Sequence, residues 1–305
     1  MAEQRRGTMA NLITEGDQTR QRLLKQIEGV NGSRVVSYLA NPNASPNFMD
    51  NNDPIFFNDL LECTRGCEVL DVIIDSPGGE ANVAERLAIM CRECSPIVRA
   101  IVINSAKSAA TMFALSTDEI MMGYLSEIGP IDPQIRLATP QGFNYIPAHS
   151  LIGAVGQVNG MLQGGVDQRI VLGMVQKIDP AFIDFAQRAI LFSKNFAETQ
   201  LSQHMLVGQP ERAKEIAEAL SNNDRWLSHG KRIGIKEAQE LGLKIRSIDK
   251  NSELWKLLWE YYARAQIHMN NGGIVKLYET SSYSLSLNLS GQRTRQPQQT
   301  PREET

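Results

Sequence analysis

The sequence has 305 residues, of which 42% are hydrophobic and 21% are charged. This apolar content is enough to bury a full core, so we expect one large domain with appendages. The formal net charge of -3 gives no electrostatic reason to expect a nucleic acid partner. No stretch approaches the roughly 20 apolar residues that cross a bilayer, and Arg5-Arg6 precedes no apolar signal region. We therefore expect a cytoplasmic protein without a membrane span.

Residues 1–30 are expected to form an N-terminal helical extension, because 15–28 carry a modest apolar stripe. A first strand is predicted at 34–39. A loop rich in Asn and Pro follows, and the next helix starts at Asp53-Pro54. This order is typical of a chain in which strands and helices alternate.

Two consecutive strand-turn-helix units come next. Their strands are predicted at 70–74 and 97–103, and their helices at 82–94 and from Ser108 onward. A third short strand is predicted at 119–122. Such alternation favours an α/β fold with a mostly parallel sheet and right-handed crossovers.

The turns of these two units hold residues suited to nucleophilic catalysis. Ser108 lies where a strand becomes a helix, close to backbone N–H groups that have no intrahelical partner and that favour a developing oxyanion. The small Ala109 and Ala110 let a carbonyl approach the backbone closely. The Gly78-Gly79 pair can expose N–H groups in conformations that other residues avoid. Together the turns predict attack by Ser108 with a two-point oxyanion hole.

A purely structural interpretation of this serine stays open. Strand-serine-helix turns are common in α/β proteins without a catalytic role, and Ser108 can serve simply as the N-cap of its helix.

The four cysteines also allow two interpretations. Cys63 with Cys67 and Cys91 with Cys94 have spacings that suit zinc ligands. Both pairs fall in predicted helices, where the same spacing places side chains on one buried face. We expect core cysteines and no metal site.

Three ordered motifs resemble the signature of the serine dehydrogenase proteinase family. They are Asp75-Ser76-Pro77-Gly78-Gly79, Ala106-Lys107-Ser108-Ala109-Ala110-Thr111 and Ser126-Glu127-Ile128-Gly129-Pro130-Ile131-Asp132-Pro133-Gln134. That family belongs with the Clp-fold serine peptidases, beside signal peptide peptidase A and the Clp proteolytic subunit. The similarity covers most of residues 31–250.

The resemblance implies a ClpP/crotonase-like fold for residues 31–250. It implies Ser108 as the nucleophile, and Gly78 of the glycine pair with Ala109 as oxyanion donors. It also implies a peptide or unfolded-protein substrate and a homo-oligomer, because Clp-fold peptidases generally assemble. We see no site that argues for a pyridoxal group and expect no cofactor.

Several residues compete for the role of general base, which a serine nucleophile needs within hydrogen-bond reach. Clp-type peptidases use a histidine after the nucleophile helix, but the matching segment 126–134 contains none. Signal peptide peptidase A uses a lysine, which Lys177 loosely resembles. Lys107, His149 and His229 are the alternatives. Lys107 can instead guard the site or pair with an acid such as Asp75, and each histidine can be structural.

Segment 126–134 resembles the part of the family that lies beside the substrate groove. We expect Gly129-Pro130 to shape that edge, along which an extended peptide can add as a strand. Glu127 and Asp132 can orient a base, or can fix the loop through local hydrogen bonds.

The second half of the chain reads as mostly helical. A hairpin turn or a flexible edge is predicted near 139–144. The C-terminal part divides into a helix and arm at 251–289, in which 278–289 forms a strand or an ordered arm, and a disordered tail at 290–305. The aromatic helix at 251–270 either caps the core or makes a subunit contact. Helices are predicted at 150–162, 166–175, from Pro180, 211–220 and 235–241, and a strand at 244–248.

Three functions follow from these observations. The favoured one is a cytoplasmic serine peptidase that forms an acyl-enzyme on Ser108, with a Lys or His base. The alternatives are a crotonase-like acyl-CoA enzyme, which would not need a serine at the helix start, and a non-catalytic oligomeric scaffold of the same fold.

Overall fold

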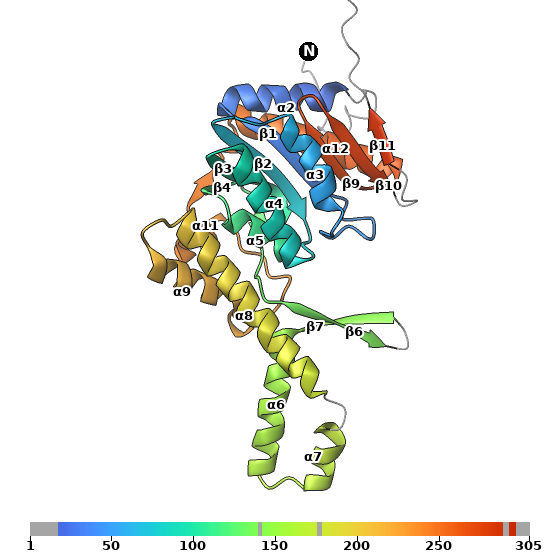
Figure 1. Cartoon of the computed structure of the whole chain (residues 1–305), viewed down its shortest axis with the longest axis vertical. Coiled ribbons are helices and arrows are strands. Elements are labelled where there is room, and N and C mark those ends of the chain that lie inside the picture. The colour runs from blue at the N-terminus through green and yellow to red at the C-terminus, as the bar shows by residue number, and fades with distance from the viewer. Residues whose placement is uncertain (1–17, 140–141, 176–178, 289–292, 297–305) are drawn as a thin grey trace, which may run out of the picture. The chain divides into compact units, whose positions relative to one another are not determined.

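The protein is described by a computed structural model, which covers residues 18–139, 142–175, 179–288 and 293–296. It confirms the predicted mixed α/β fold with a central, mostly parallel sheet (Figure 1). The chain divides into two compact units. The first comprises residues 1–128 and 232–305, and the second comprises residues 129–231.

The sheet of the first unit has the strand order β11-β10-β9-β1-β2-β3-β4-β8, with the short β5 paired to β3. Strands β1, β2, β3, β4, β5 and β8 run parallel to one another. Strands β9, β10 and β11 add an antiparallel edge beside β1. Their bounds are β1 Arg34–Ala40, β2 Val69–Ser76, β3 Ile97–Ala106, β4 Glu119–Met122, β5 Glu127–Ile128, β8 Ile245–Ser247, β9 Ile274–Thr280, β10 Ser284–Asn288 and β11 Arg293–Gln296.

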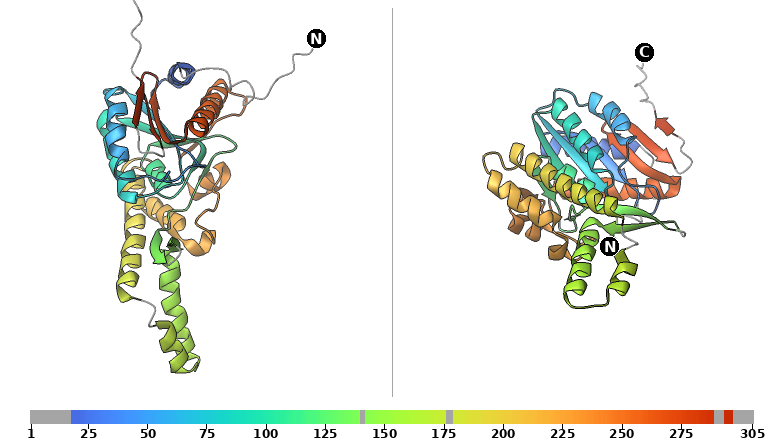
Figure 2. Two further views of the ribbon diagram at one scale, coloured as in Figure 1. Left: turned by 90° about the vertical axis from the view of Figure 1, so that its right-hand side faces the viewer. Right: turned by 60° about the horizontal axis from the view of Figure 1, so that its bottom comes forward.

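Helices cover both faces of this sheet. One face carries α3 (Asp53–Glu62) and α4 (Ala81–Cys94), and the other carries α2 (Gln18–Asn31) and α12 (Glu253–Gly272), as the left view of Figure 2 shows. The short α5 (Ala109–Leu115) follows β3, and α11 (Ile235–Leu241) precedes β8. Alternate residues of the central strands therefore meet different helices, as the period of a strand requires.

The aromatic helix α12 belongs to the core. Leu254, Trp255, Leu258, Tyr261 and Tyr262 are buried in one cluster with residues of α2 and of the strands beneath. The same cluster holds α2, so the helix predicted as an N-terminal extension packs on the sheet. Of the two interpretations of 251–270, the one in which the helix covers the core is the one observed.

The C-terminal arm differs from expectation in one place. Strands β9 and β10 replace the single strand or arm predicted at 278–289. The prediction of disorder is wrong for Arg293–Gln296, which pair antiparallel with β10. Backbone pairing extends the sheet edge there although the composition is polar. Residues 289–292 and 297–305 lie outside the described residues.

The second unit starts with a hairpin and continues as helices. Strands β6 (Gln134–Thr139) and β7 (Gly142–Pro147) flank the predicted turn. None of the described helices combines the length and apolar composition that crossing a bilayer requires. The helices of this unit are α6 Ala148–Gln163, α7 Gln168–Val175, α8 Pro180–Gln203, α9 Pro210–Ser221 and α10 Asn223–Trp226.

A buried carboxylate at the end of β2 ties the first unit together. Asp75 Oδ2 accepts a 2.7 Å hydrogen bond from the Tyr262 hydroxyl of α12. Its Oδ1 accepts from the Ser105 N–H at 3.1 Å and from Asn104 Nδ2 at 3.2 Å, both on β3. Burial raises the pKa of Asp75 to about 6, although these donors oppose the shift.

The raised pKa of Asp75 predicts a pH-dependent contribution to stability. The folded state binds this proton more tightly than the unfolded state, so the ionised carboxyl lowers the unfolding free energy increasingly as pH rises from about 4 to 6. The full cost is about 3 kcal/mol above that window. In urea titrations at several pH values, Asp75→Asn should gain about that much relative to the parent between pH 4 and 7. A difference independent of pH would contradict this assignment.

Candidate active site

Ser108 has a strained backbone in the turn between β3 and α5. Its φ of 49° and ψ of -118° lie in a region that residues with a Cβ rarely adopt. Such a conformation costs on the order of 1–3 kcal/mol and is found mostly at functional sites. Ser108 occupies the N-cap position, but its side chain does not cap α5. The capping interpretation therefore lacks its hydrogen bond.

Backbone hydrogen bonds on both sides hold this turn. The Lys107 N–H donates to the Ser76 carbonyl at 3.0 Å, which joins the end of β2 to the end of β3. The Ala110 and Met112 N–H groups then donate back to Lys107 and Ser108, at 2.8 and 3.0 Å, and start the helix. Because these bonds fix the backbone, the half-buried Ser108 side chain has a defined direction.

The predicted glycine pair lies directly against the serine turn. Gly78 and Gly79 have φ values of +97° and +148°, as the sequence analysis expected of them. A Cβ added to Gly78 would lie 2.5 Å from the Lys107 carbonyl oxygen and 2.8 Å from Ser108 Cβ. A Cβ on Gly79 would lie 2.3 Å from the Met49 carbonyl oxygen. Only glycine allows this packing.

Two amides of this region are available to an incoming oxyanion. Ala109 starts α5, so its N–H has no intrahelical acceptor, and no acceptor for it or for the Gly79 N–H is found among the described residues. The Gly78 N–H donates to Ser76 Oγ at 3.1 Å, and an oxyanion there would have to compete with that hydroxyl. The turn thus brings together Ser108, Ala109 and both glycines, as the sequence predicted.

Lys107 points its ammonium to the neighbouring strand. Its Nζ lies 2.8 Å from Glu127 Oε1 and 3.3 Å from the Ile128 carbonyl oxygen. The lysine thus forms an ion pair, but with Glu127 and not with Asp75, the acid named as a partner from the sequence. The carboxylate of Asp75 is instead hydrogen-bonded to Tyr262, Asn104 and Ser105. A role of Lys107 as proton acceptor would first require the loss of its ion pair with Glu127.

The other candidate bases belong to the second unit. His149 lies in the first turn of α6, and its Nε2 is buried without a hydrogen-bond partner in the described part of the chain. Lys177 lies outside the described residues. His229 forms a 3.0 Å hydrogen bond from Nδ1 to Oδ1 of the buried Asp132. A carboxylate at Nδ1 holds the imidazole so that Nε2 can accept a proton.

Sequence reasoning weighed His229 and Asp132 separately and did not pair them. They are 97 positions apart, and no periodic pattern connects them. The only indication of such a pair in the sequence was their chemistry, since one motif contains an acid and another contains a histidine.

The segment that contains Gly129 and Pro130 follows β5. Within β5, Ile128 pairs with Ala106 of β3 and also exchanges two 3.0 Å backbone hydrogen bonds with Ile233. An added peptide strand therefore cannot use the Ile128 backbone. Gly129 and Pro130 are both buried.

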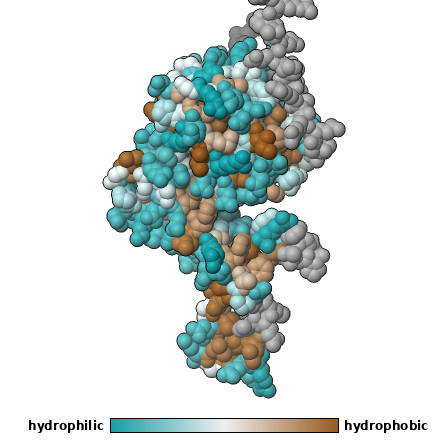
Figure 3. Space-filling view, in the orientation of Figure 1, coloured by the Kyte–Doolittle hydropathy of each residue, from teal (hydrophilic) through white to brown (hydrophobic). Residues whose placement is uncertain are grey.

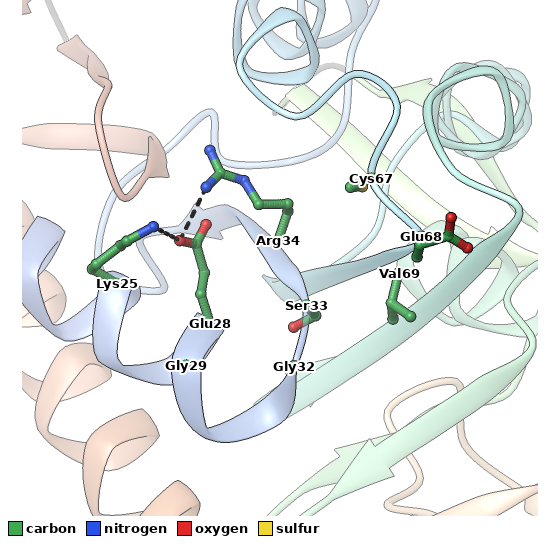
Figure 4. A pocket seen from close by; sticks show the side chains of 9 residues that line it. All are labelled: Lys25, Glu28, Gly29, Gly32, Ser33, Arg34, Cys67, Glu68 and Val69. Carbon is green, nitrogen blue, oxygen red and sulfur yellow. Dashed lines mark hydrogen bonds and ion pairs between the residues drawn. The ribbon is translucent and has the colours of Figure 1, made fainter.

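A hollow of about 440 Å³ lies at the C-terminal end of α2 (Figure 4). Lys25 and Arg34 on its wall both pair with Glu28, at 3.1 and 3.4 Å. With Glu68, which also lines it, the two positive and two negative charges on its wall balance, and none of the candidate site residues lines it. We assign it no role in the chemistry of Ser108.

The cysteines are free thiols. Burial raises the thiol pKa values of Cys67, Cys91 and Cys94. In the described part of the chain, no three His, Cys, Asp or Glu side chains gather in a way that would hold a metal ion.

The close approach of Gly78 to the serine turn predicts the effect of a single methyl group. Gly78→Ala should lower the unfolding free energy by at least about 3 kcal/mol, because the Cβ meets backbone atoms and φ is positive. Gly32→Ala is the matched control, with a φ of +62° and open space around the added Cβ, and should cost about 1 kcal/mol. Urea denaturation measures both. Equal losses would mean that the close approach does not matter.

Comparison with known proteins agrees with this geometry. The family model described as "ClpP-like SDH-type serine proteinase" matches residues 17–276. Among curated proteins of Methanocaldococcus jannaschii, Uncharacterized protein MJ0137 is 32% identical over 176 residues, and Uncharacterized protein MJ1495 is 26% identical over 238 residues. These alignments cover 58% and 75% of this chain, and 53% and 72% of the relatives. The chain thus spans about half the length of the first relative.

Two solved structures of a 1510-N membrane-bound stomatin-specific protease are among the structural matches. A mutant of that protease matches with 15% identity and a TM-score of 0.42, covering 69% of this chain and 79% of the other. A second mutant, in complex with a substrate peptide, matches with 17% identity and a TM-score of 0.33, covering 70% and 90%. Because the family model spans most of its length, the chain belongs to the ClpP-like SDH-type serine proteinases.

Proposed function

We propose that the protein is a serine endopeptidase that cleaves peptides or unfolded protein segments through an acyl-enzyme on Ser108. The observation that carries the proposal is the strained Ser108, whose hydroxyl caps nothing, beside a glycine pair that admits no other residue. Strain of this kind is expected where a side chain is held for attack.

In the proposed reaction, Ser108 Oγ attacks the peptide carbonyl carbon while a base takes its proton. The carbonyl oxygen becomes an oxyanion, which the Ala109 N–H and an N–H of Gly78 or Gly79 stabilise. The C–N bond then breaks, and the protonated base delivers the proton to the leaving amine. Water hydrolyses the resulting ester by the same sequence, and Oγ regains its proton.

We propose a Lys or His general base, and among the described candidates His229 is the one whose imidazole a buried carboxylate orients. Asp132 is 1% exposed and lies 3.0 Å from His229 Nδ1, the arrangement in which a carboxylate orients a basic imidazole. His149 and Lys177 remain the competing residues, and Lys107 is disfavoured by its ion pair with Glu127. Gly129 and Pro130 are proposed to border the bound peptide beyond Ile128.

The setting of the reaction is also a proposal. The four cysteines are free, which suits the reducing cytoplasm. The alternatives, an acyl-CoA enzyme of the crotonase type or a scaffold without activity, would leave the conformation of Ser108 unexplained.

Assembly into a homo-oligomer is supported by an exposed apolar surface on α6, α7 and α8. Figure 3 shows it as brown over α6 and α7. The charges on it pair locally, Asp167 with Arg169 and Asp184 with Arg188, each at 2.7 Å. A neutral apolar surface resembles the core of a protein interface. Its exposed members are Val155, Met161, Leu162, Val166, Ile170, Leu172, Phe182, Phe185, Leu191 and Phe192.

A serine-directed fluorophosphonate tests the nucleophile. The parent protein should be labelled and should hydrolyse a peptide ester, and Ser108→Ala should lose the label and at least about 10³-fold of the rate. Ser105→Ala, in the strand just before the turn, is the control and should keep both. Labelling that survives Ser108→Ala would disprove the nucleophile, and no labelling of the parent would favour the acyl-CoA or scaffold alternatives.

The same assay ranks the bases. His229→Ala should lower the rate about 10³-fold, and Asp132→Asn should lower it less. The Lys177→Ala, His149→Ala and Lys107→Ala variants should each retain most of the activity. If one of these three matches the loss in Ser108→Ala while His229→Ala does not, that residue is the base.

Light scattering tests the assembly. Ile170→Glu places a charge on the apolar surface, at a residue that is 62% exposed. The variant should form particles of lower mass than the parent protein does. Ile89→Glu, at a residue 54% exposed on α4, is the matched control and should leave the mass unchanged. A parent protein that is monomeric at micromolar concentration would contradict the proposal.

A further inference from the structure

A buried lysine on β9 holds the loop that precedes α3. Lys276 is 2% exposed, and its Nζ lies 2.7 Å from both Asp50 Oδ2 and Asp53 Oδ1. Asp53 is fully buried and also accepts hydrogen bonds from the hydroxyls of Tyr38 and Tyr278. Burial raises the pKa of Asp53, and the charge of Lys276 opposes that rise. The ammonium is thus the positive charge that both carboxylates contact.

The ionic cluster of Lys276, Asp50 and Asp53 adjoins Met49, the residue before Asp50, and the backbone of Met49 supports the glycine pair. The Asp50 N–H donates to Asp53 Oδ2 at 2.8 Å, which fixes the chain just after Met49. Met49 in turn donates its N–H to the Gly78 carbonyl oxygen at 2.7 Å, and its own carbonyl accepts the Glu80 N–H at 3.1 Å. Met49 and Gly79 form an isolated parallel bridge.

The glycine pair is therefore held between two walls. The Met49 carbonyl lies against Gly79, where an added Cβ would approach to 2.3 Å, and the Lys107–Ala109 turn lies against Gly78, where it would approach to 2.5 Å. Ser76 provides a second connection between the glycine pair and the ionic cluster. Its Oγ accepts a hydrogen bond from the Gly78 N–H, and its side chain also interacts with Tyr38, where it partly opposes the rise in the pKa of that hydroxyl. A shift of the Met49 segment would move the glycine amides relative to Ser108.

A buried ion pair is a poor source of stability, because desolvation of the charges offsets their attraction. This ion pair instead restricts where its side chains can lie. The contacts of Lys276 with Asp50 and Asp53, and of the Asp50 N–H with Asp53, leave the two acids little freedom to move. Oxyanion donors lose much of their effect when they are displaced by about 1 Å. We propose that Lys276 is a positioning residue for catalysis: through Asp50 and Asp53 it fixes Met49, and through Met49 it sets the amides of Gly78 and Gly79 opposite Ser108. This proposal rests on the proposed peptidase function.

The test compares two buried ion pairs made by the same strand. Lys276 and Glu279 lie on opposite faces of β9, and Glu279 pairs with the buried Arg20 at 3.0 Å between α2 and the sheet. Lys276→Met should lower kcat for a peptide ester about 10–100-fold with KM changed less than about threefold. Arg20→Met removes a comparable charge that does not touch Met49 or the glycines, and should lower stability but keep kcat.

Amide hydrogen exchange gives a readout that does not depend on activity. The Met49 and Glu80 N–H groups are the donors of the bridge, so both should exchange faster in Lys276→Met and not in Arg20→Met. If Lys276→Met does not fold, Asp50→Asn serves instead. It leaves the Lys276 pair with Asp53 intact and should lower kcat several-fold, with faster exchange at the same two amides.

The outcomes separate this proposal from the one it rests on. Unchanged kcat and unchanged exchange would overturn the role of Lys276, as would an equal loss of kcat in Arg20→Met. If the parent protein shows no turnover that depends on Ser108, the peptidase proposal fails. The exchange at Met49 and Glu80 then still decides whether Lys276 holds the glycine loop.

Discussion

The site depends on one close packing contact, that of the Gly78 backbone against the turn from Lys107 to Ala109. No side chain fits there, since even a methyl group would lie 2.5 Å from a carbonyl oxygen. The contact brings the ends of β2 and β3 together, and with them the proposed nucleophile Ser108 and the amides proposed as its oxyanion donors. The rest of the first unit can be understood as the support of this contact.

Buried carboxylates supply much of that support. Asp53, Asp75 and Glu279 each bind groups from distant parts of the chain: Lys276 in the first case, Tyr262 in the second, and Arg20 with Tyr261 in the third. Apolar contacts provide most of the folding free energy but tolerate small shifts. Hydrogen bonds to a charge do not, because their energy falls steeply with misalignment. These acids therefore add precision around an apolar core.

The two units contribute different properties to the proposed peptidase. The first, built on the sheet, carries Ser108, the glycine pair and their supports. The second carries the hydrogen-bonded His229 and Asp132 and the apolar surface of α6 to α8.

The sequence by itself determined the strand-turn-helix units, the place of Ser108 and the need for glycine at 78 and 79, because periodicity and turn chemistry are local properties of a chain. Only the tertiary structure decided that Lys107 binds Glu127, that Asp132 meets His229, and that the aromatic face of α12 is core. Each of these outcomes joins segments that are separated in the chain. Which distant partner compensates a buried charge, or covers an apolar face, follows from the packing of the whole fold and leaves no pattern in the residues nearby.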